Sequence, residues 1–323
     1  MLSTRWGMNR YDSARRRQRC AMIAFPMEET PIPLRTSVLV VSYNMAEALR
    51  RCLTALDQSA GRESFEIIVV DNGSEDDSLA VIDSFANVTP LRLPRNFGFV
   101  KALNIGMRTA KGEFFLFLNP KTEVRPDTVA ALTARLDEAA DAIAVSPALE
   151  TPDGRPAGFL YKLPAPANLR AVAAAGKFEA AAAPEGGAET VPVEFAGFAA
   201  LLVRAYFLKG LRYIDERYAH SWADAEVAIQ IRRAGKKTLF APGVGAIWHA
   251  EDGLERRMPA AALDLLAADW TLGAATYGGK HFGFAAGLKV RLLAALSALF
   301  SARLRRFSYL TGGQKIDGTQ AAM

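Results

Sequence analysis

Short apolar runs alternate with segments of helical periodicity through the first half of the chain. The apolar runs, rich in Val, Ile, Leu and Phe, lie at 36–41, 65–70, 88–93 and 114–118. The first three are each followed by apolar residues at helical spacing, at 45–58, 76–85 and 99–109. A helix that begins near Pro126 and a strand at 142–146 continue the series. Strands and helices that alternate in this way predict an α/β fold with a doubly wound, mainly parallel sheet flanked by helices.

The pattern changes in the second half of the chain. Residues 151–189 are rich in Ala, Pro and Gly and predict a long loop or an insertion with weak helices. Strand-like and helical patterns then resume at 191–203, 224–234, 238–241 and 246–248. From Leu288 onward, apolar residues share one helical face and basic residues flank it. This predicts a basic amphipathic helix, which either lies on an anionic membrane surface or packs on the domain with its basic face in solvent.

Composition narrows the class of protein. Half of the 323 residues are apolar, which is enough for a substantial core, and the net charge is only +5. Much of the basic excess lies near the two ends, so we expect no binding of nucleic acid. Cys20 and Cys52 form neither a disulfide framework nor a zinc pattern. No apolar run reaches the roughly 20 residues of a spanning helix. We therefore expect a cytoplasmic protein without a transmembrane helix.

Polar side chains follow four consecutive predicted strands at the point where each strand ends. They are Ser42, Asn44, Asp71, Asn72, Ser74, Asn96 and Asn119. Each one alone could be an ordinary turn or helix N-cap residue. In parallel sheets, however, the carboxyl ends of the strands meet at one edge, and ligands bind there. The set therefore predicts a binding site, and Lys121, just after the fourth strand, is predicted to face its ligand.

Four motifs at these strand ends resemble those of the family 2 inverting glycosyltransferases, in their rhamnosyltransferase-like branch. They read Val-Val-Ser-Tyr-Asn at 40–44, Val-Val-Asp-Asn-Gly-Ser-Glu-Asp at 69–76, Arg-Asn-Phe-Gly-Phe at 95–99 and Phe-Leu-Asn-Pro-Lys-Thr-Glu-Val at 117–124. Each motif is weak alone, but the four occur in the family's order. The resemblance covers about Thr36 to Gly283 and implies the GT-A fold, which binds nucleotide diphosphate-sugars.

The resemblance implies a donor such as dTDP-L-rhamnose or a UDP-sugar, and a glycan or lipid-linked acceptor. By position, Asp71 would accept a hydrogen bond from the imide N–H of uracil or thymine, which is a suitable donor for a carboxylate. The complete donor site implied by the resemblance is Ser42, Tyr43, Asn44, Asp71, Asn72, Ser74, Asn96, Gly98, Asn119 and Lys121.

A later segment, Ser-Trp-Ala-Asp-Ala-Glu at 221–226, resembles the family's acceptor segment, where an acidic pair stands at the start of a helix. The resemblance implies that Asp224 is the catalytic base that deprotonates the acceptor hydroxyl. A helix N-cap is the alternative role for this residue. Trp222 and Glu226 would lie on the acceptor side.

Three residues depart from the family pattern. Ala223 stands where the family usually has Glu, Gln230 where it often has Arg, and Lys121 where it has the acidic metal ligand. A lysine cannot ligate Mg²⁺ or Mn²⁺, which take oxygen ligands, but its ammonium can meet the sugar diphosphate directly. Two alternatives stay open: transfer without a metal ion, or an ion held by Glu123 or by His249, which lies in a segment similar to the family's terminal His segment.

These observations divide the chain into four parts. We expect a flexible basic arm at 1–34, which shortens if translation starts at Met22 or Met27, a GT-A domain at 35–283, an amphipathic helix at 284–307 and a tail at 308–323. Within the domain, 35–125 would bind the nucleotide and 126–283 the acceptor.

The implied function is inverting sugar transfer in cell-surface polysaccharide synthesis, at the inner face of the cytoplasmic membrane. The departures leave a second possibility, a catalytically degenerate paralogue that binds a nucleotide or glycan or acts as a scaffold. His220 and His281 are expected to be surface or packing residues.

Overall fold

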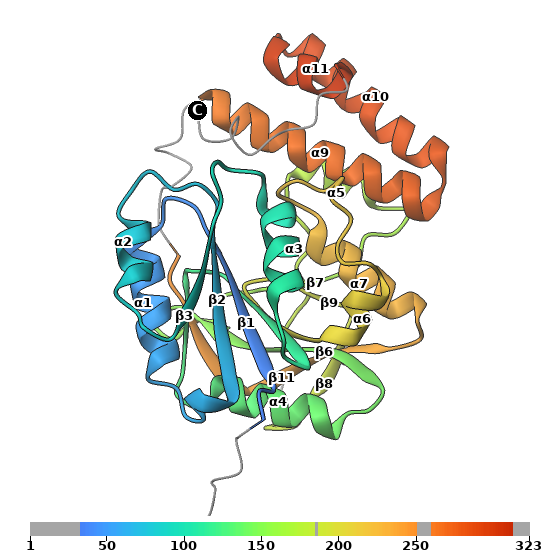
Figure 1. Ribbon diagram of the computed structural model, residues 1–323. Helices are drawn as coiled ribbons and strands as arrows, with labels where there is room; N and C mark the ends of the chain where they lie inside the picture. Colours follow the sequence, from blue (N-terminus) through green and yellow to red (C-terminus); the bar gives the residue numbers. More distant parts are fainter. Residues whose placement is uncertain (1–32, 185–186, 251–259, 313–323) are drawn as a thin grey trace, which may run out of the picture. The chain divides into compact units, whose positions relative to one another are not determined.

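The computed structural model describes residues 33–184, 187–250 and 260–312 (Figure 1). The chain divides into Met1–Ile32 and Pro33–Met323. The predicted basic arm and most of the predicted tail therefore lie outside the described residues, and the predicted domain boundaries stay predictions. At the centre of the described part is a sheet with the strand order β3-β2-β1-β4-β10-β6-β11-β5, in which β8 also pairs with β11. A separate pair of strands, β7 and β9, forms a small second sheet.

The secondary structure follows the expected alternation through the first half of the chain. The strands are β1 (Thr36–Ser42), β2 (Phe65–Asp71), β3 (Val88–Arg92), β4 (Phe114–Leu118), β5 (Thr122–Val124), β6 (Ala142–Glu150), β7 (Leu160–Tyr161), β8 (Val191–Val193), β9 (Phe195–Ala196), β10 (Ala200–Arg204) and β11 (Lys237–Trp248). The α-helices are α1 (Ala46–Asp57), α2 (Ser78–Asp83), α3 (Phe99–Thr109), α4 (Thr128–Glu138), α5 (Leu169–Ala175), α6 (Ala205–Gly210), α7 (Ala223–Arg233), α9 (Ala260–Phe282), α10 (Phe284–Phe300) and α11 (Leu304–Thr311), with a short 3-10 helix at Arg62–Ser64.

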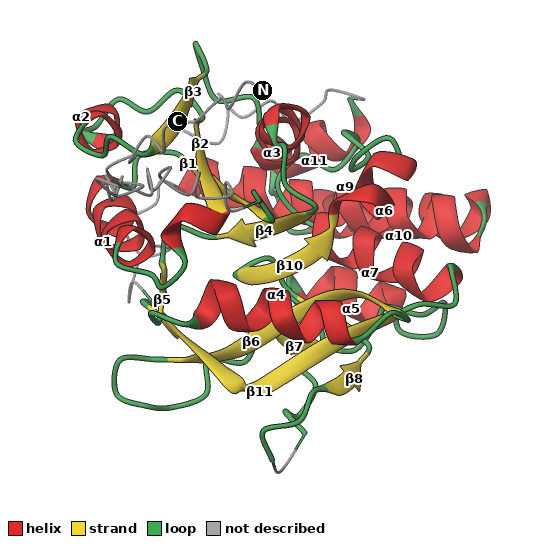
Figure 2. Ribbon diagram, turned by 60° about the horizontal axis from the view of Figure 1, so that its bottom comes forward, coloured by secondary structure: helices red, strands yellow, loops and turns green. Residues whose placement is uncertain are grey.

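Strand direction separates the sheet into two parts. Strands β3, β2, β1 and β4 are mutually parallel. Strand β10 lies between β4 and β6 and is antiparallel to both (Figure 2). The predicted α/β fold with a doubly wound sheet is confirmed, and the departures from a mainly parallel sheet are β10 and the strands β5 and β8, which run antiparallel to β11. The direction of β10 was hidden because a central strand buried on both faces has the same apolar pattern whether it runs parallel or antiparallel.

Alternate side chains of the strands enter two cores on opposite faces of the sheet. Val38 and Val40 of β1 pack in the core that α1, α2 and α4 cover. Leu39, between them, packs in the core that α3 and α7 cover. Figure 1 shows α1 and α2 on one side of the sheet and α3, α6 and α7 on the other. This period of two fixes the register of β1, and therefore the direction in which the loop after Ser42 leaves the sheet.

The last third of the chain differs most from expectation. The two strands predicted at 238–241 and 246–248 are one strand, β11, with an irregularity between Ala241 and Gly245 where it pairs with β6. The single helix predicted at 284–307 is two helices, because the chain turns between α10 and α11, where Ala302 has φ 54°. Helix α9 was not predicted; it packs against α5, α10 and α11. No helix in the described ranges is long and apolar enough to cross a membrane.

Candidate active site

Asp71, the last residue of β2, is buried and holds the turn that follows it. Its Oδ2 accepts hydrogen bonds from the backbone N–H groups of Gly73 (3.2 Å) and Ser74 (3.0 Å). Its Oδ1 is buried and has no hydrogen-bond partner among the described residues, and the same holds for Oγ of Ser42 at the end of β1. A buried acceptor without a partner costs about 1–3 kcal/mol, which a ligand N–H would recover.

The loops after β1 and β2 are joined by side-chain to backbone hydrogen bonds. The backbone N–H of Asn44 donates to Ser74 Oγ (3.0 Å), and the N–H of Glu75 donates to Asn44 Oδ1 (2.8 Å). Asn44 adopts a left-handed conformation with φ 51°, which asparagine tolerates better than most residues. Two of the predicted donor-site residues, Asn44 and Ser74, therefore shape the loops of the site.

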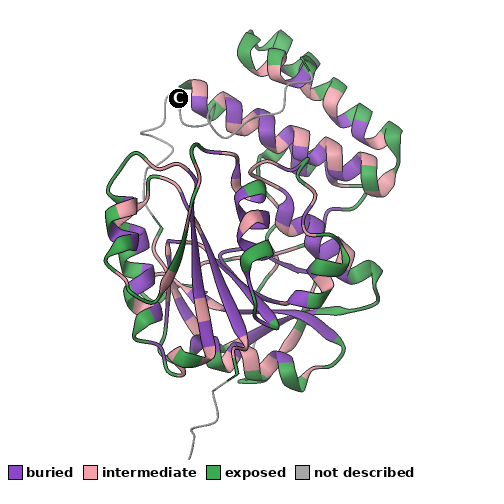
Figure 3. Cartoon of the chain, viewed as in Figure 1, coloured by how far each residue is buried: buried purple, intermediate pink, exposed green. Residues whose placement is uncertain are grey.

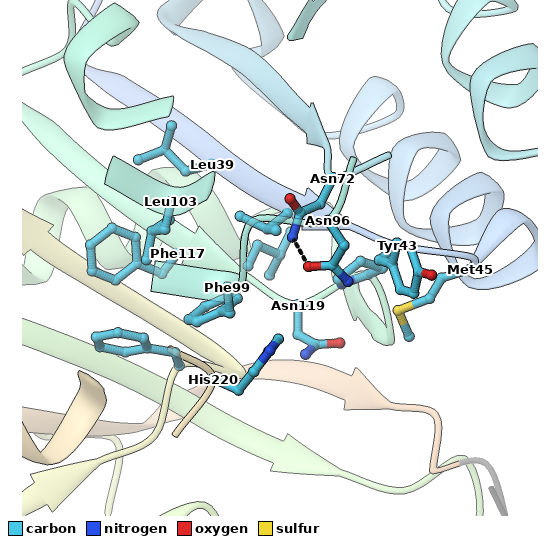
Figure 4. Close-up of a pocket in the computed structure, with 14 residues that line it drawn as sticks. Leu39, Tyr43, Met45, Asn72, Asn96, Phe99, Leu103, Phe117, Asn119 and His220 are labelled. Atoms are coloured by element: carbon cyan, nitrogen blue, oxygen red, sulfur yellow. Dashed lines mark hydrogen bonds between the residues drawn. The ribbon is translucent and has the colours of Figure 1, made fainter. Parts of the chain in front are cut away.

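A buried amide pair joins the loops after β2 and β3. Asn72 Nδ2 donates to Asn96 Oδ1 (2.9 Å), while Asn72 Oδ1 accepts from the N–H of Phe97 (2.9 Å) (Figure 4). Asn96 Oδ1 also accepts from the N–H of Gly98 (2.9 Å). Gly98 has φ +89°, and a Cβ there would lie 3.1 Å from the carbonyl oxygen of Ala219. The position therefore favours glycine, and the backbone of the segment that precedes α7 lies close to the loop after β3.

These loops enclose a pocket of 240 Å³ at the carboxyl ends of β1, β2 and β4 (Figure 4). Its polar lining residues are Tyr43, Asn72, Asn96, Asn119 and His220, and its aromatic wall is Phe99, Phe117 and Phe198. Burial and the charge of Glu75 raise the pKa of Tyr43, so its hydroxyl stays protonated. The structure thus brings four of the predicted residues to one pocket. Those that lie outside its lining are Ser42, Asn44, Asp71, Ser74, Gly98, Lys121, Trp222, Asp224, Glu226 and His249.

His220 is the residue of this pocket that sequence reasoning missed. Its Nε2 is buried without a hydrogen-bond partner in the described part of the chain, and its ring lies near Asn119 in Figure 4. Behind it, Ser221 Oγ donates to Oδ2 of the buried Asp269 on α9 (2.6 Å). Burial raises the pKa of Asp269, while the charge of His220 and hydrogen bonds from His220 and Ser221 oppose that rise. No local signal pointed to His220, because α9 follows it by some 40 residues and was itself unpredicted.

Asp224 lies in the first turn of α7, close to the pocket. The residue that precedes the helix is Trp222, so Asp224 lies inside the helix and not at its N-cap, although its Oδ1 accepts from the backbone N–H of Ala225 (2.9 Å). Burial raises the pKa of Asp224 to about 6. A Cβ on Gly197 would lie 3.6 Å from Asp224 Oδ2, and Phe198, the next residue, lines the pocket. Burial and the charge of Asp224 raise the pKa of the nearby Tyr161 to about 12.

Trp222 supports the start of α7 from within the core. Only 1% of its surface is exposed, and its conformation is left-handed, with φ 71°. Its ring packs against Trp270 and Tyr277 of α9, each with a centroid distance of 5.2 Å, and against Phe178 at 5.0 Å. A left-handed tryptophan costs on the order of 1–3 kcal/mol, and this aromatic packing holds it in place. With so little exposed surface, Trp222 has no face for the acceptor contact predicted for it.

Glu226 is buried one turn into α7 and has four hydrogen-bond partners. Its Oε2 accepts from Tyr218 (2.8 Å) and contacts Nε2 of His281 (2.6 Å), and its Oε1 accepts from Gln230 (2.9 Å) and Lys280 (2.7 Å). Burial alone would raise the pKa of Glu226, but the bonds from His281, Gln230 and Lys280 lower it to about 2. Both carboxylate oxygens are therefore occupied by contacts that tie α7 to α9.

Lys121, Glu123 and His249 lie together where β5 pairs with the end of β11. The backbone oxygen of Lys121 accepts from the N–H of His249 (2.9 Å), and His249 Nε2 lies 2.7 Å from Glu123 Oε2. The described residues contain no group of three or more His, Cys, Asp or Glu that could hold a metal ion. Glu123 and His249 alone fall short of the six ligands that Mg²⁺ requires. A divalent ion fits here only if diphosphate oxygens complete its coordination.

A parallel half-sheet with a buried aspartate at its ligand edge, joined to a second half that brings another carboxylate beside the pocket, defines a GT-A nucleotide-sugar transferase fold. Residues 37–174 match the family model described as glycosyl transferase family 2. The predicted family and fold are thereby confirmed, while the rhamnosyltransferase-like branch stays a prediction.

Curated relatives match a similar length of the chain. The protein named uncharacterized glycosyltransferase YfnE, from Bacillus subtilis (strain 168), is 36% identical over 100 residues, which are 30% of this chain and 26% of YfnE. Poly(ribitol-phosphate) beta-N-acetylglucosaminyltransferase TarS from Staphylococcus aureus (strain Mu50 / ATCC 700699) is 28% identical over 110 residues, 32% of this chain and 19% of TarS. Undecaprenyl-phosphate 4-deoxy-4-formamido-L-arabinose transferase from Proteus mirabilis (strain HI4320) is 28% identical over 116 residues, 34% of this chain and 36% of the relative. The chain thus matches only about a fifth to a third of each relative.

Solved structures resemble most of the chain in fold. Residues 1–349 of S. aureus TarS superpose with a TM-score of 0.52 at 15% identity, over 86% of this chain and 92% of that one. The mannosyltransferase PcManGT from Pyrobaculum calidifontis, solved with GDP-Man and Mn²⁺, gives a TM-score of 0.52 at 17% identity, over 92% of this chain and 88% of that one. At these identities the likeness establishes the fold alone.

Proposed function

We propose that the protein transfers a sugar from a nucleotide diphosphate-sugar to a glycan or lipid-linked acceptor, with inversion at the anomeric carbon. The observation that carries the proposal is Asp224, a carboxylate whose pKa burial raises to about 6, beside the pocket enclosed by the donor loops. The unpartnered Oδ1 of Asp71 supports a uracil or thymine nucleotide. The names of TarS and the arabinose transferase support a place in cell-surface glycan synthesis, and we propose dTDP-rhamnose or a UDP-sugar as the donor.

The transfer would be an in-line displacement. The acceptor oxygen bonds to the anomeric carbon and gives its proton to Asp224, while the bond from that carbon to the diphosphate oxygen breaks. The diphosphate leaves with added negative charge, and Lys121, at the end of β4, is the residue we assign to meet it. At about 4 Å one such charge pair contributes roughly 1 kcal/mol in water and about 4 kcal/mol at an effective dielectric near 20. A divalent ion bound beside Glu123 and His249 would add Lewis-acid stabilisation of the same oxygens.

A donor panel in the presence of EDTA tests this proposal. We expect transfer to persist with EDTA, and Lys121→Ala to lower kcat/KM by about tenfold to a thousandfold, because the replaced charge stabilises the leaving group. Mass spectrometry measures product formation. The control is Lys111→Ala, which removes a lysine at the opposite, amino-terminal end of β4. If EDTA abolishes transfer, a metal ion and not Lys121 stabilises the charge of the leaving diphosphate. Measurable nucleotide binding with no turnover on any donor would favour the degenerate paralogue, for which Ala223 and Gln230 are the supporting departures.

His220 is expected to contribute to donor binding. His220 lines the pocket, and its buried Nε2 has no partner in the described residues, so we expect an oxygen of the sugar donor to form a hydrogen bond with its ring. His220→Ala should raise the KM for the donor by about tenfold, whereas His220→Gln, which keeps a donor group, should restore part of the loss. Steady-state kinetics measure both. An unchanged donor KM in His220→Ala, with an unchanged Tm, would remove His220 from the site.

We also propose that α10 places the protein on an anionic membrane surface, at the inner face of the cytoplasmic membrane. Its large exposed residues, Leu292 (53%) and Leu296 (48%) among them, lie near basic side chains such as Lys289. The double variant Leu292→Gln, Leu296→Gln should weaken binding to phosphatidylglycerol vesicles by tenfold or more, because each buried leucine contributes roughly 1.5–3 kcal/mol. Vesicle co-sedimentation measures this, with Ser297→Gln on the same helix as the control. Equal binding of the double variant would show that another segment makes the contact.

A further inference from the structure

A groove of 510 Å³ lies between α9 and α10, away from the donor pocket. The two helices approach closely along its floor, since a side chain at Gly287 would collide with the carbonyl oxygen of Ala275 and would lie 2.8 Å from the backbone nitrogen of Gly279. The apolar walls are Leu272, Phe284 and Leu288. Three cations also line the groove: Arg217, Lys280 and Arg291.

The cations of the groove are held in place by the fold. Lys280 Nζ lies 2.9 Å from Asp215 Oδ2 and 2.7 Å from Glu226 Oε1, and Arg217 Nη2 lies 2.6 Å from the same oxygen of Asp215. Lys280 and Arg217 thus pair with two carboxylates, and Arg291 adds a third positive charge to the groove. The Nε of Arg291 donates to the carbonyl oxygen of Leu310 (2.6 Å), and neither of its terminal nitrogens has a hydrogen-bond partner among the described residues. An arginine fixed through Nε presents a planar donor pair that suits a phosphate group.

The groove continues into an apolar strip on the outer face of α10. Phe284 (79% exposed), Leu288 (41%), Leu292 (53%) and Leu296 (48%) follow one another at intervals of four residues. Gly287, Val290, Ala295 and Ala298 of the same helix are buried. Figure 3 shows exposed and buried residues along α10. Phe284 and Leu288 belong to both the groove and the strip, so a cationic floor and an apolar surface meet at the same two side chains.

We propose that this groove binds the phosphate headgroup of a single anionic lipid, whose acyl chains lie along the strip from Phe284 to Leu296. The phosphate oxygens accept hydrogen bonds from Arg291, Arg217 and the third donor of Lys280. This assignment rests on the proposed contact of α10 with the membrane, and adds to it a defined site with phosphate selectivity. The charge and the apolar strip together select the occupant: a phosphorylated amphiphile satisfies both, whereas a free anion leaves the strip in water.

Binding of soluble short-chain lipids tests the site without a bilayer. Isothermal titration with dihexanoyl phosphatidic acid below its micelle concentration should show one site per chain, and dihexanoyl phosphatidylcholine, whose phosphate carries a bulky quaternary ammonium group, should bind at least tenfold more weakly. Arg291→Gln should weaken phosphatidic acid binding by about tenfold. The matched control is Lys289→Gln, which removes the same charge from the same helix outside the groove and should change the affinity by less than about twofold.

Several results would overturn the proposal. Equal losses in Lys289→Gln and Arg291→Gln would show only general attraction to charge. Inorganic phosphate that binds as tightly as phosphatidic acid would make this a free-anion site. If the protein is a dimer by analytical ultracentrifugation without lipid, and Leu288→Gln dissociates that dimer, the strip is the interface with a second copy of the chain. Two other results would support a separate site. Loss of vesicle binding in the double variant Leu292→Gln, Leu296→Gln with retained phosphatidic acid binding would distinguish the groove from the membrane contact. Retained binding of the sugar donor in Arg291→Gln would distinguish the groove from the transfer site.

Discussion

Replacement of Asp224 by asparagine is expected to abolish sugar transfer without unfolding the protein. The amide has the same shape but cannot take the acceptor proton, so kcat should fall by about 10²–10⁴-fold. Donor affinity should stay near that of the unchanged protein, because Asp224 does not line the donor pocket. Thermal shift with UDP or dTDP measures that affinity, since a ligand that binds only the folded state raises Tm. Loss of transfer together with loss of nucleotide binding would contradict a purely catalytic role.

The pH dependence of transfer gives a second test of Asp224. The base acts in its ionised form, and burial raises its pKa to about 6 from the usual 3.8. The rate should therefore rise with pH up to about 6 and then level off. Stability follows the opposite sign: ionisation of a half-buried carboxyl whose pKa is raised disfavours the folded state, so this contribution declines as pH rises from about 4 to 6. Asp224→Asn removes the buried charge and should leave Tm at pH 7 unchanged or higher. A rate that does not change between pH 5 and 7 would exclude this residue as the base.

Replacement of Glu226 by alanine is expected to be among the most destabilising changes in the protein. The carboxylate accepts bonds from Tyr218, Gln230 and Lys280 and contacts His281, all of which would be left without it in a buried site. Removal of one member of such a buried charged network costs about 3–5 kcal/mol. For a chain of this size that corresponds to a fall in Tm on the order of 10 °C. Chemical denaturation measures the free energy of unfolding directly.

The control for Glu226 is Glu138→Ala, which removes an exposed glutamate and should change stability by less than about 0.5 kcal/mol. Acid titration gives the sign of the effect. The folded pKa of Glu226 is lowered to about 2, so its stabilisation is fully present above the usual value of 4.5 and is lost as pH falls from there toward 2. If Glu226→Ala folds with unchanged stability but loses acceptor specificity, the acceptor role that the resemblance implied would be correct after all.

The amino-terminal half of the fold could be predicted because its signals are local. Strands β1, β2 and β4 are continuous apolar runs, and each is followed by a helix or by a polar corner within a few residues. Once a parallel sheet is inferred, its carboxyl edge gathers Tyr43, Asn72, Asn96 and Asn119 without further information. Asp71 and Asn72 lie at the predicted strand end, but the sequence did not determine their separate roles. Asp71 has a buried Oδ1 without a partner in the described residues, whereas the side chain of Asn72 is hydrogen-bonded to Asn96.

What the sequence by itself determined, then, is the alternating α/β pattern, the ligand edge and the family resemblance, because periodicity and short motifs act within one strand-loop-helix unit. Only the tertiary structure decided the roles of His220, Glu226 and the C-terminal helices. The position of His220 depends on its contact with Asp269, and the carboxylate of Glu226 is occupied by Lys280 and His281. Each of these partners belongs to α9, some 49 to 55 residues further along the chain. Contacts at such separations leave no periodic trace in the sequence, since burial and hydrogen bonding between distant elements are fixed by packing.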